Sequence, residues 1–246
     1  MTAVAASQVA MAAVASSQVA MAAVASSQVA MAAVIGNATA LNAVVTSSVA
    51  MAAVASSQVA MAAIVKSPVA MAAMWRSDTA IKALQANATA WKTFTGASSA
   101  VMGKTVAILA NLDPSGYADM TAVAASQVAM AAVAASNTAT KAIAASQTAL
   151  NAIAGSTTAL DALYAKKSRL TGASAAKSGK FIILEISANS AFDTSQYGYA
   201  TLSDGSKPNW QDYKSKYAYF KQFKKIATYI KNDTEGDDWI DYFPCG

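Results

Sequence analysis

Residues 17–26 read Ser-Gln-Val-Ala-Met-Ala-Ala-Val-Ala-Ser, and variants of this ten-residue unit recur without a slip through residues 1–94. A second array of the same unit, shifted by one position, occupies residues 118–170. Self-similarity at a fixed period is typical of repeat architectures, in which one unit cannot bury its apolar face alone and must stack on its neighbours. The repeat therefore decides the fold of most of the chain.

Each unit contains a helix break, and the residues at the break predict a helix N-cap. The break position is always Ser or Asn, the preferred capping residues. Pro68 and Asp78 directly follow two of these positions, where proline and a carboxylate suit the first helical turn. Gly36 and Gly155 directly precede two others, where a helix must end. The predicted N-caps are Ser17, Ser27, Asn37, Ser47, Ser57, Ser67, Ser77, Asn87, Ser126, Ser136, Ser146 and Ser156.

Within each short helix the apolar residues predict one buried face. They stand three, four and seven positions after the cap, with a small Ala at position six that lets neighbouring helices approach closely. Position five is polar wherever it is not Ala, as in Asn42, Lys82 and Asp161. We expect an elongated α-solenoid of short, N-capped helices. A trimeric bundle of long helices is the rival, although the apolar stripe of one continuous helix would drift by about 80° per ten residues.

A second duplication marks the module boundaries. The segment Thr-Gly-Ala-Ser begins at residue 95 and again at residue 171, each time followed by Gly-Lys and an apolar run. Residues 1–11 and 120–130 are identical. The predicted division is helical array 1 at 1–94, a linker with a short β segment at 95–117, helical array 2 at 118–170 and a C-terminal β domain at 171–246.

The C-terminal region is predicted to be β-structure, which makes the fold class α+β. Residues 181–187 and 197–202 are rich in β-branched and aromatic residues. Residues 225–231 and 239–243 flank Asn-Asp-Thr-Glu-Gly-Asp-Asp, which predicts a hairpin. We expect four or five short strands in a small sandwich or open sheet.

The composition argues against an enzyme. The chain has no His, one Cys (Cys245) and only 13% charged residues, so imidazole bases and multi-thiolate metal sites are excluded. Residues 1–65 carry no charge, and a net charge of +5 without a basic stripe gives little reason to expect nucleic acid. Apolar runs are about seven residues long, so no membrane span is expected. No catalytic residue, cofactor or metal is predicted.

Candidate contact residues lie in the aromatic, charged C-terminal region. Aromatic rings with a polar edge can stack on sugars or pack against a partner, and lysines can meet an anionic surface, although core packing and a solvated strand edge explain the same residues. The candidates for ligand or partner contact are Trp210, Tyr213, Tyr217, Tyr219, Lys221 and Lys224. A calcium site at Asp233, Glu235, Asp237 and Asp238, and a hydrolytic carboxylate pair of Asp204 and Asp212, are weaker hypotheses.

The repeats resemble a known class of proteins. Decapeptides such as Ser146-Gln-Thr-Ala-Leu-Asn-Ala-Ile153 and Asn87-Ala-Thr-Ala-Trp91, followed by Thr-Gly-Ala-Ser and a Gly-Lys segment, are similar to the Ala-rich repeat proteins of tailed bacteriophages described as tail-fibre, tail or virulence-associated. The resemblance covers about residues 1–190 and includes no catalytic residue. It implies a structural or adhesive virion protein, assembled in the host cytoplasm and released by lysis.

Three functions follow as expectations. The first is a non-enzymatic structural virion protein, a spacer or fibre with a terminal domain that docks to other tail proteins or contacts a host. The second is an adhesin that binds host surface glycan. The third is an extracellular, self-assembling filament subunit, because the outer face of the array is almost uncharged. A homo-oligomer or fibre is expected in each case.

Overall fold

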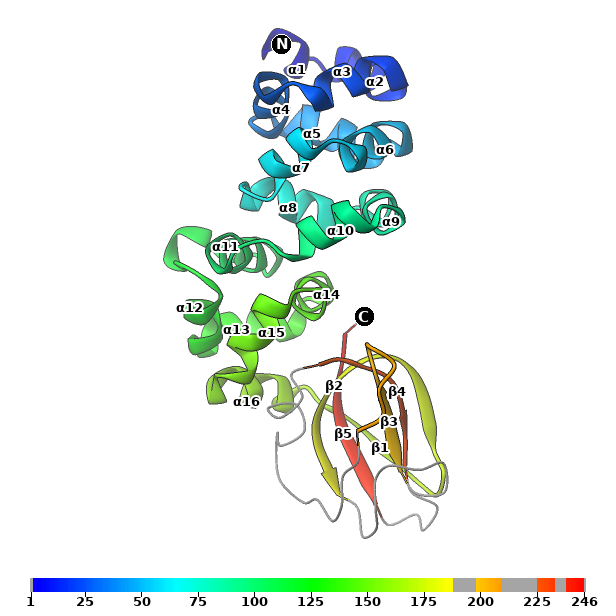
Figure 1. Ribbon diagram of the computed structural model, residues 1–246. Coiled ribbons are helices and arrows are strands. Elements are labelled where there is room, and N and C mark those ends of the chain that lie inside the picture. Colours follow the sequence, from blue (N-terminus) through cyan, green and yellow to red (C-terminus); the bar gives the residue numbers. More distant parts are fainter. Residues whose placement is uncertain (1, 188–197, 209–224, 233–237, 246) are drawn as a thin grey trace. The chain divides into compact units, whose positions relative to one another are not determined.

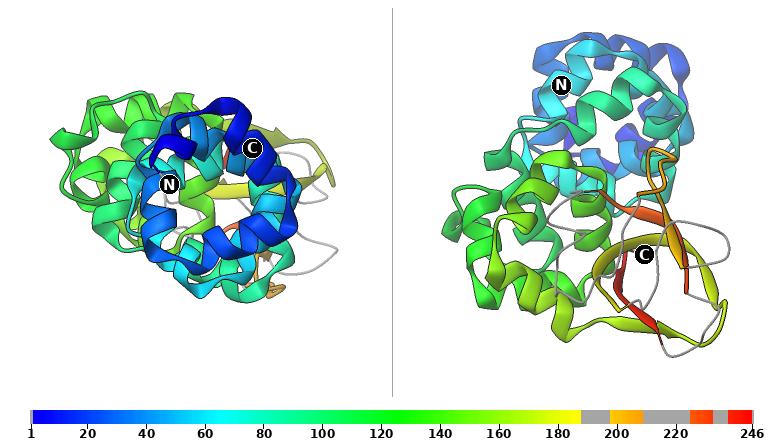
Figure 2. Two further views of the ribbon diagram at one scale, coloured as in Figure 1. Left: turned by 90° about the horizontal axis from the view of Figure 1, so that it is seen from above. Right: turned by 60° about the horizontal axis from the view of Figure 1, so that its bottom comes forward.

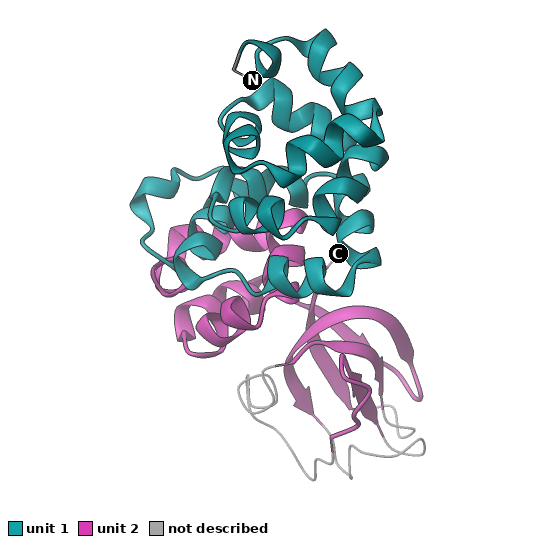
Figure 3. Cartoon of the chain, turned by 45° about the horizontal axis from the view of Figure 1, so that its top comes forward, with its two compact units in different colours: residues 1–119 teal, residues 120–246 magenta. Residues whose placement is uncertain are grey.

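The computed structural model describes residues 2–187, 198–208, 225–232 and 238–245. These form two compact units, residues 1–119 and residues 120–246 (Figure 3). Unit 1 contains helices only, whereas unit 2 contains a second set of helices and a small antiparallel sheet (Figure 1). Helices followed by an antiparallel sheet confirm the predicted α+β class.

Unit 1 consists of short helices, of which α1 to α10 follow the ten-residue repeat and α11 comes after it. They are α1 Thr2–Ala5, α2 Gln8–Ser16, α3 Gln18–Ser26, α4 Gln28–Ile35, α5 Ala38–Thr46, α6 Ser48–Ser56, α7 Gln58–Ile64, α8 Pro68–Trp75, α9 Asp78–Ala86, α10 Ala88–Thr95 and α11 Ser99–Leu109, with a 3₁₀ turn η1 at Pro114–Gly116. The chain bends by 101° between α2 and α3 and by 103° between α4 and α5. Seen from above, the helices follow one another round a common axis (Figure 2).

The bends bring every third helix together. α2 packs on α5, α3 on α6, α4 on α7, α5 on α8, α6 on α9, α7 on α10 and α8 on α11. We call three consecutive helices, 30 residues of sequence, a layer. Successive layers therefore present the same helices, in the same order, to one another.

One face of each helix forms the core. The residue four positions after the cap is buried in α3 and α6 (Met21 and Met51), and so is the residue at position seven (Val54). Burial at position six is uneven: Ala23 is exposed and Ala53 is partly buried, whereas Ala142 is completely buried. Position eight was not predicted to belong to the core, yet Ala25 and Ala55 are buried there. Positions four and eight are one helical turn apart, so they lie on the same face. The polar residues at position five, such as Asn42 and Lys82, are exposed as predicted.

The predicted β segment between the arrays is a helix. Ser98 caps α11 by accepting a hydrogen bond from the amide of Val101, and Met102, Val106 and Leu109 are buried along one side of the helix. Residues 105–109 form a run too short to distinguish a strand from a helix by its pattern alone. In the structure the segment is helical and packs on α8.

Unit 2 begins with a second set of short helices. They are α12 Met120–Ala125, α13 Gln127–Ala135, α14 Asn137–Ala145, α15 Gln147–Ala154 and α16 Thr157–Ala165. Here too every third helix packs together, α12 on α15 and α13 on α16. The helical array ends at Ala165 rather than at residue 170, because residues 168–171 pair with a strand from the end of the chain.

The strands of unit 2 form one five-stranded antiparallel sheet in the order β1-β5-β2-β4-β3. They are β1 Ser168–Thr171, β2 Ala176–Ser187, β3 Tyr199–Leu202, β4 Ala227–Lys231 and β5 Trp239–Pro244. In the described part of the chain there is thus an open sheet and not two facing sheets of a sandwich. The predicted hairpin of β4 and β5 was wrong, because β2 lies between them and pairs with both.

β2 bends in the middle and so joins the two halves of the sheet. Its first half pairs with β4 and its second half, from Phe181, pairs with β5. Gly179 stands just before the change of partner at φ +148°, a conformation that residues with a Cβ rarely adopt. The sheet core gathers the buried side chains Phe181, Ile183, Ile186, Ala200, Leu202, Ala227, Ile230, Ile240 and Tyr242.

Candidate functional site

The structure places all twelve predicted N-cap residues at the N-cap position of a helix. In each, the side-chain oxygen accepts a hydrogen bond of 3.0–3.3 Å from the backbone amide three residues on. Each bond supplies a partner for one of the amides that a helix start leaves unpaired. Ser7 and Ser98 cap helices in the same way and were not predicted, although Ser7 fits the same ten-residue spacing.

Several of these caps also hold successive layers together. The Ser47 hydroxyl donates to the carbonyl oxygen of Ala15 at 2.5 Å, and Ser57 donates to Ala25 at 2.5 Å. The Asn87 amide donates to Ala55 at 3.0 Å, and in unit 2 Ser156 donates to Ala124 at 2.6 Å. In every case the partner lies 32 residues earlier, at the end of a helix in the preceding layer.

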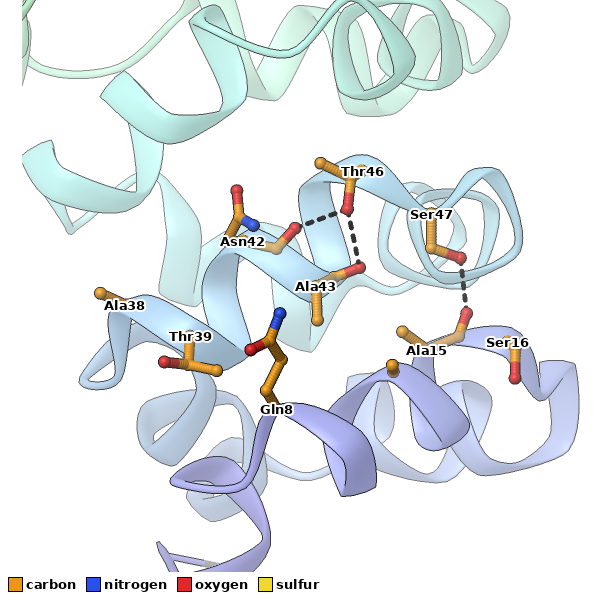
Figure 4. A pocket seen from close by; sticks show the side chains of 10 residues that line it. Gln8, Ala15, Ser16, Ala38, Thr39, Asn42, Ala43, Thr46 and Ser47 are labelled. Atoms are coloured by element: carbon orange, nitrogen blue, oxygen red, sulfur yellow. Dashed lines mark hydrogen bonds between the residues drawn. The ribbon is translucent and has the colours of Figure 1, made fainter.

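Shallow grooves run between the stacked helices of successive layers. The groove between α2 and α5 has a volume of about 580 Å³, and a similar one between α3 and α6 has about 700 Å³. Figure 4 shows that small side chains line the first groove and that the Gln8 side chain extends from α2 toward Thr39 and Ala43 of α5. The Thr46 hydroxyl already donates to the carbonyl of Asn42 at 2.8 Å. These grooves offer methyl groups and few charged contacts.

A further groove, of about 790 Å³, lies between α5 and α8, and the side chain of Arg76 lines it. Arg76 donates to the carbonyl oxygen of Ile108 at 2.8 Å, in the helix packed against α8. Arg76 therefore contacts the carbonyl end of α11, a position that the helix dipole makes favourable for a cation. Its environment is that of a structural contact.

The aromatic residues of unit 1 gather at the end of its array. Trp75, Trp91 and Phe94 have ring centroids 5.2–6.2 Å apart. Phe94 is completely buried, and Trp75 stands eight residues after the cap, where several other repeats have Ala. Among the described residues, the Trp75 indole nitrogen is the buried side-chain polar atom without a hydrogen-bond partner. These three aromatic rings therefore form part of the hydrophobic core of unit 1.

Among the described residues, a group of charged side chains gathers in unit 2, where α16 meets the sheet. The Asp241 carboxylate on β5 has no solvent-exposed surface and accepts two hydrogen bonds from Arg169 of β1, at 2.6 and 2.7 Å. Lys167 forms an ion pair with the same carboxylate. Tyr164 of α16 donates to Glu185 of β2 at 2.7 Å. We call these five residues the charged junction.

The charged junction keeps its ionised carboxylate and its hydroxyl donor at neutral pH. Burial raises the pKa of Asp241, but hydrogen bonds from Arg169 and Lys167 outweigh burial and hold that pKa below its usual value. The Arg169 guanidinium also lies 3.7 Å from the ring centroid of Trp239. Burial raises the pKa of Tyr164, so its hydroxyl keeps its proton and remains a donor. Asp241 is therefore ionised at neutral pH, and its hydrogen bonds connect β5 to α16 and to β1.

The remaining sequence candidates divide into two groups. Trp210, Tyr213, Tyr217, Tyr219, Lys221 and Lys224 lie outside the described residues, as do Asp212, Asp233, Glu235 and Asp237.

Asp204 forms an ion pair with Lys225, which holds the Asp204 pKa well below its usual range. Asp238 is buried, and within the described ranges no three potential metal-binding side chains gather. Cys245 is a buried free thiol, and burial raises its pKa to about 12.

The described residues contain no single helix that is long and apolar enough to cross a membrane, while three bent helix pairs reach that length together. Comparison with known proteins finds no family model that matches the chain and no match among curated proteins.

Proposed function

We propose that this chain is a non-enzymatic structural protein, in which the helical repeats form an α-solenoid spacer and the C-terminal sheet is a terminal docking domain. The observation that carries the proposal is the repeated bond between layers, of which Ser47 to Ala15 is an example. The same cap side chain starts its own helix and ties it to the preceding layer. A chain built in this way gains length by adding repeats, without any change in the contacts between them.

The charged junction supports the second half of the proposal. A spacer serves a terminal domain only if the joint between them is firm. Asp241, Arg169 and Tyr164 connect the last helix of unit 2 to three strands of its sheet. A buried charge pair of this kind favours one arrangement, because any other would leave a charge buried without its partner.

The biological setting we propose rests on the resemblance to bacteriophage repeat proteins. In that setting the chain is associated with the virion tail, is assembled in the host cytoplasm and leaves the cell by lysis. Its partners would be other tail proteins or host surface glycan. Co-purification of the chain with intact phage particles, and its loss from particles that lack tails, would test this setting.

The spacer function is tested by removing one complete layer. Deleting residues 28–57 joins Ser27 to Gln58 and recreates the Ser-Gln-Val-Ala-Met sequence at the junction. This variant should fold cooperatively, and X-ray scattering should give a particle shorter by about 8–10 Å, one helix-packing distance. The matched control deletes residues 28–52, which removes fewer residues but destroys the cap spacing. If both deletions unfold the array, the spacer proposal is wrong.

A glycan-binding adhesin is the second candidate, and one observation on the sheet favours it. Tyr199 of β3 and Tyr229 of β4 are partly exposed on one face, with ring centroids 5.4 Å apart, and the Lys207 ammonium lies 4.5 Å from the Tyr199 ring centroid. Aromatic faces flanked by polar groups suit sugar rings. A glycan array probed with wild type and with Tyr229→Ala tests it, since wild type should bind and the variant should not.

A further inference from the structure

Strands β2, β4 and β3 lie side by side in the sheet of unit 2, and their two faces differ in character (Figure 1). Directly opposed residues of antiparallel strands point to the same face, and successive residues of one strand point to opposite faces. Ile230 of β4 opposes Ala200 of β3, and both are completely buried in the sheet core. The residues next to them along the strands therefore point away from that core.

The face away from the core carries two rows of polar and aromatic side chains. In the first row Tyr199 of β3 opposes Lys231 of β4. In the second row Tyr229 of β4 stands between Thr201 of β3 and Ser178 of β2. All five residues are partly or fully exposed. We call them the tyrosine face.

The two tyrosines present aromatic surface and hydroxyl groups together. Their ring centroids are 5.4 Å apart and their planes are inclined by 32°. Burial and a hydrogen bond with Tyr199 raise the pKa of Tyr229, so the Tyr229 hydroxyl keeps its proton at neutral pH. An aromatic ring packs against the C–H groups of a sugar, while hydroxyls at its edge can form hydrogen bonds with the sugar hydroxyls. The tyrosine face therefore has the chemistry of a sugar-binding platform.

Positive charge accompanies the two tyrosine rings. The ammonium of Lys207, which is exposed, lies 4.5 Å from the ring centroid of Tyr199. The charges of Lys207 and Lys231 both lower the pKa of Tyr229, although burial and Tyr199 outweigh them, so both ammonium groups are near the Tyr229 hydroxyl. Asp204, the described acidic residue nearest to Lys207 in the sequence, is paired with Lys225. A ligand on this face thus meets cations beside the aromatic rings.

We propose that the tyrosine face, together with Lys207, binds an acidic polysaccharide, with sugar rings against Tyr199 and Tyr229 and a sugar carboxylate on the Lys207 ammonium. The proposal rests on the adhesin function proposed above and adds to it the chemical class of the glycan. A single strand of nucleic acid fits less well, because it is held by a positively charged groove that follows its closely spaced phosphates. An acidic polysaccharide can carry a single charge on each repeating unit, which two lysines suffice to meet.

The first test compares charged and uncharged ligands with the same sugar rings. A glycan array that contains acidic and neutral polysaccharides is probed with the full chain, and the bound glycans should carry carboxylates. Reducing the carboxyl groups of the best ligand to alcohols removes the charge and keeps the rings, so its affinity should fall at least about tenfold. Binding of the acidic form should also weaken as sodium chloride is raised, because salt screens exposed charges.

The second test changes the lysine. Lys207→Gln should weaken binding of the acidic glycan at least about tenfold and leave binding of the carboxyl-reduced glycan unchanged. Lys207→Arg keeps the charge and should retain most of the affinity. Because Lys207 is exposed, all variants should fold like wild type, and circular dichroism checks it.

Lys177→Gln is the matched control. Lys177 is also exposed, and its ammonium lies 5.4 Å from the ring centroid of Tyr242. It opposes Ile230, however, and so belongs to the face that carries the core. Lys177→Gln has the same net charge as Lys207→Gln and should bind the acidic glycan like wild type.

The outcomes separate this proposal from the adhesin function on which it rests. Equal binding of acidic and neutral glycans would overturn the proposal and leave the adhesin function standing, whereas binding of no glycan would overturn both. An equal loss in Lys177→Gln and Lys207→Gln would show an effect of net charge alone and would remove the site. If single-stranded DNA binds as tightly as the acidic glycan and with the same dependence on Lys207, the ligand class is wrong.

Discussion

The hydroxyl of Ser47 donates a hydrogen bond to the carbonyl oxygen of Ala15, 32 residues earlier in the chain, and accepts another from the amide of Ala50 in its own helix. One small side chain therefore performs two tasks. It starts α6, and it fastens the corner between α5 and α6 to the end of α2 in the preceding layer. The second task gives a physical reason for a constant ten-residue spacing in the units whose cap bonds the preceding layer.

Removing this hydroxyl should cost more than removing a cap alone. Ser47→Ala loses the cap bond and leaves the Ala15 carbonyl without its donor, so we expect a loss of about 2 kcal/mol in the free energy of unfolding. Ser17→Ala, which removes an equivalent cap bond to Ala20, should lose about 1 kcal/mol. Urea denaturation measures both, and equal losses would contradict a role between layers.

The methionine at position four should be the most sensitive residue of the repeat. Met51 is completely buried, so Met51→Ala leaves a cavity and should lower the free energy of unfolding by about 2–5 kcal/mol. Ala52→Ser, at the adjacent exposed position, should change it by less than about 0.5 kcal/mol. Thermal unfolding followed by circular dichroism distinguishes the two variants.

Asp241 should make the stability of unit 2 sensitive to acid. Its pKa is lower in the folded chain than in the unfolded chain, so the unfolded state binds the proton more readily. Its contribution is thus complete above the unfolded pKa of about 3.9 and is lost as pH falls toward the folded value.

Asp241→Asn tests this acid sensitivity. The variant should be less stable at pH 7, because Lys167 and Arg169 lose their anionic partner, and its stability should fall less steeply between pH 5 and pH 3 than that of wild type. Urea unfolding at a series of pH values provides the measurement. Parallel curves for the two proteins would contradict the assignment.

The thiol of Cys245 should be almost unreactive in the folded protein. It is buried, and its pKa is raised to about 12, so very little thiolate forms at pH 8. A disulfide-exchange reagent should react with the folded chain at least about tenfold more slowly than with the chain in urea. Equal rates would show that the C-terminal end of β5 opens readily.

Local sequence patterns were sufficient for the helices of the repeat. A cap bond spans three residues, so Ser or Asn at the break, Pro68 after it and Gly36 before it carry the information within a few positions. The same local signal was available at Ser98, and the spacing of Met102, Val106 and Leu109 is helical. Residues 95–109 resemble residues 171–184 in sequence, which predicted the same strand in both, but the first segment forms α11 and the second forms β2.

The sheet depended on information that is distant in the sequence. The junction residues Arg169 and Asp241 are 72 positions apart, and no local pattern indicates that they meet. Likewise β4 and β5 have the composition of a hairpin, but β2 lies between them and pairs with one along each edge. Strand order is a property of the packed sheet rather than of any single strand.

The sequence by itself determined where the helices of the repeat begin and that positions four and seven after the cap are buried, because capping and helical periodicity act over a few positions. Only the tertiary structure decided that every third helix packs together and that the cap of one layer bonds the end of another. The physical reason is that these contacts depend on the bend between consecutive helices. That bend accumulates over three repeats before two distant segments meet.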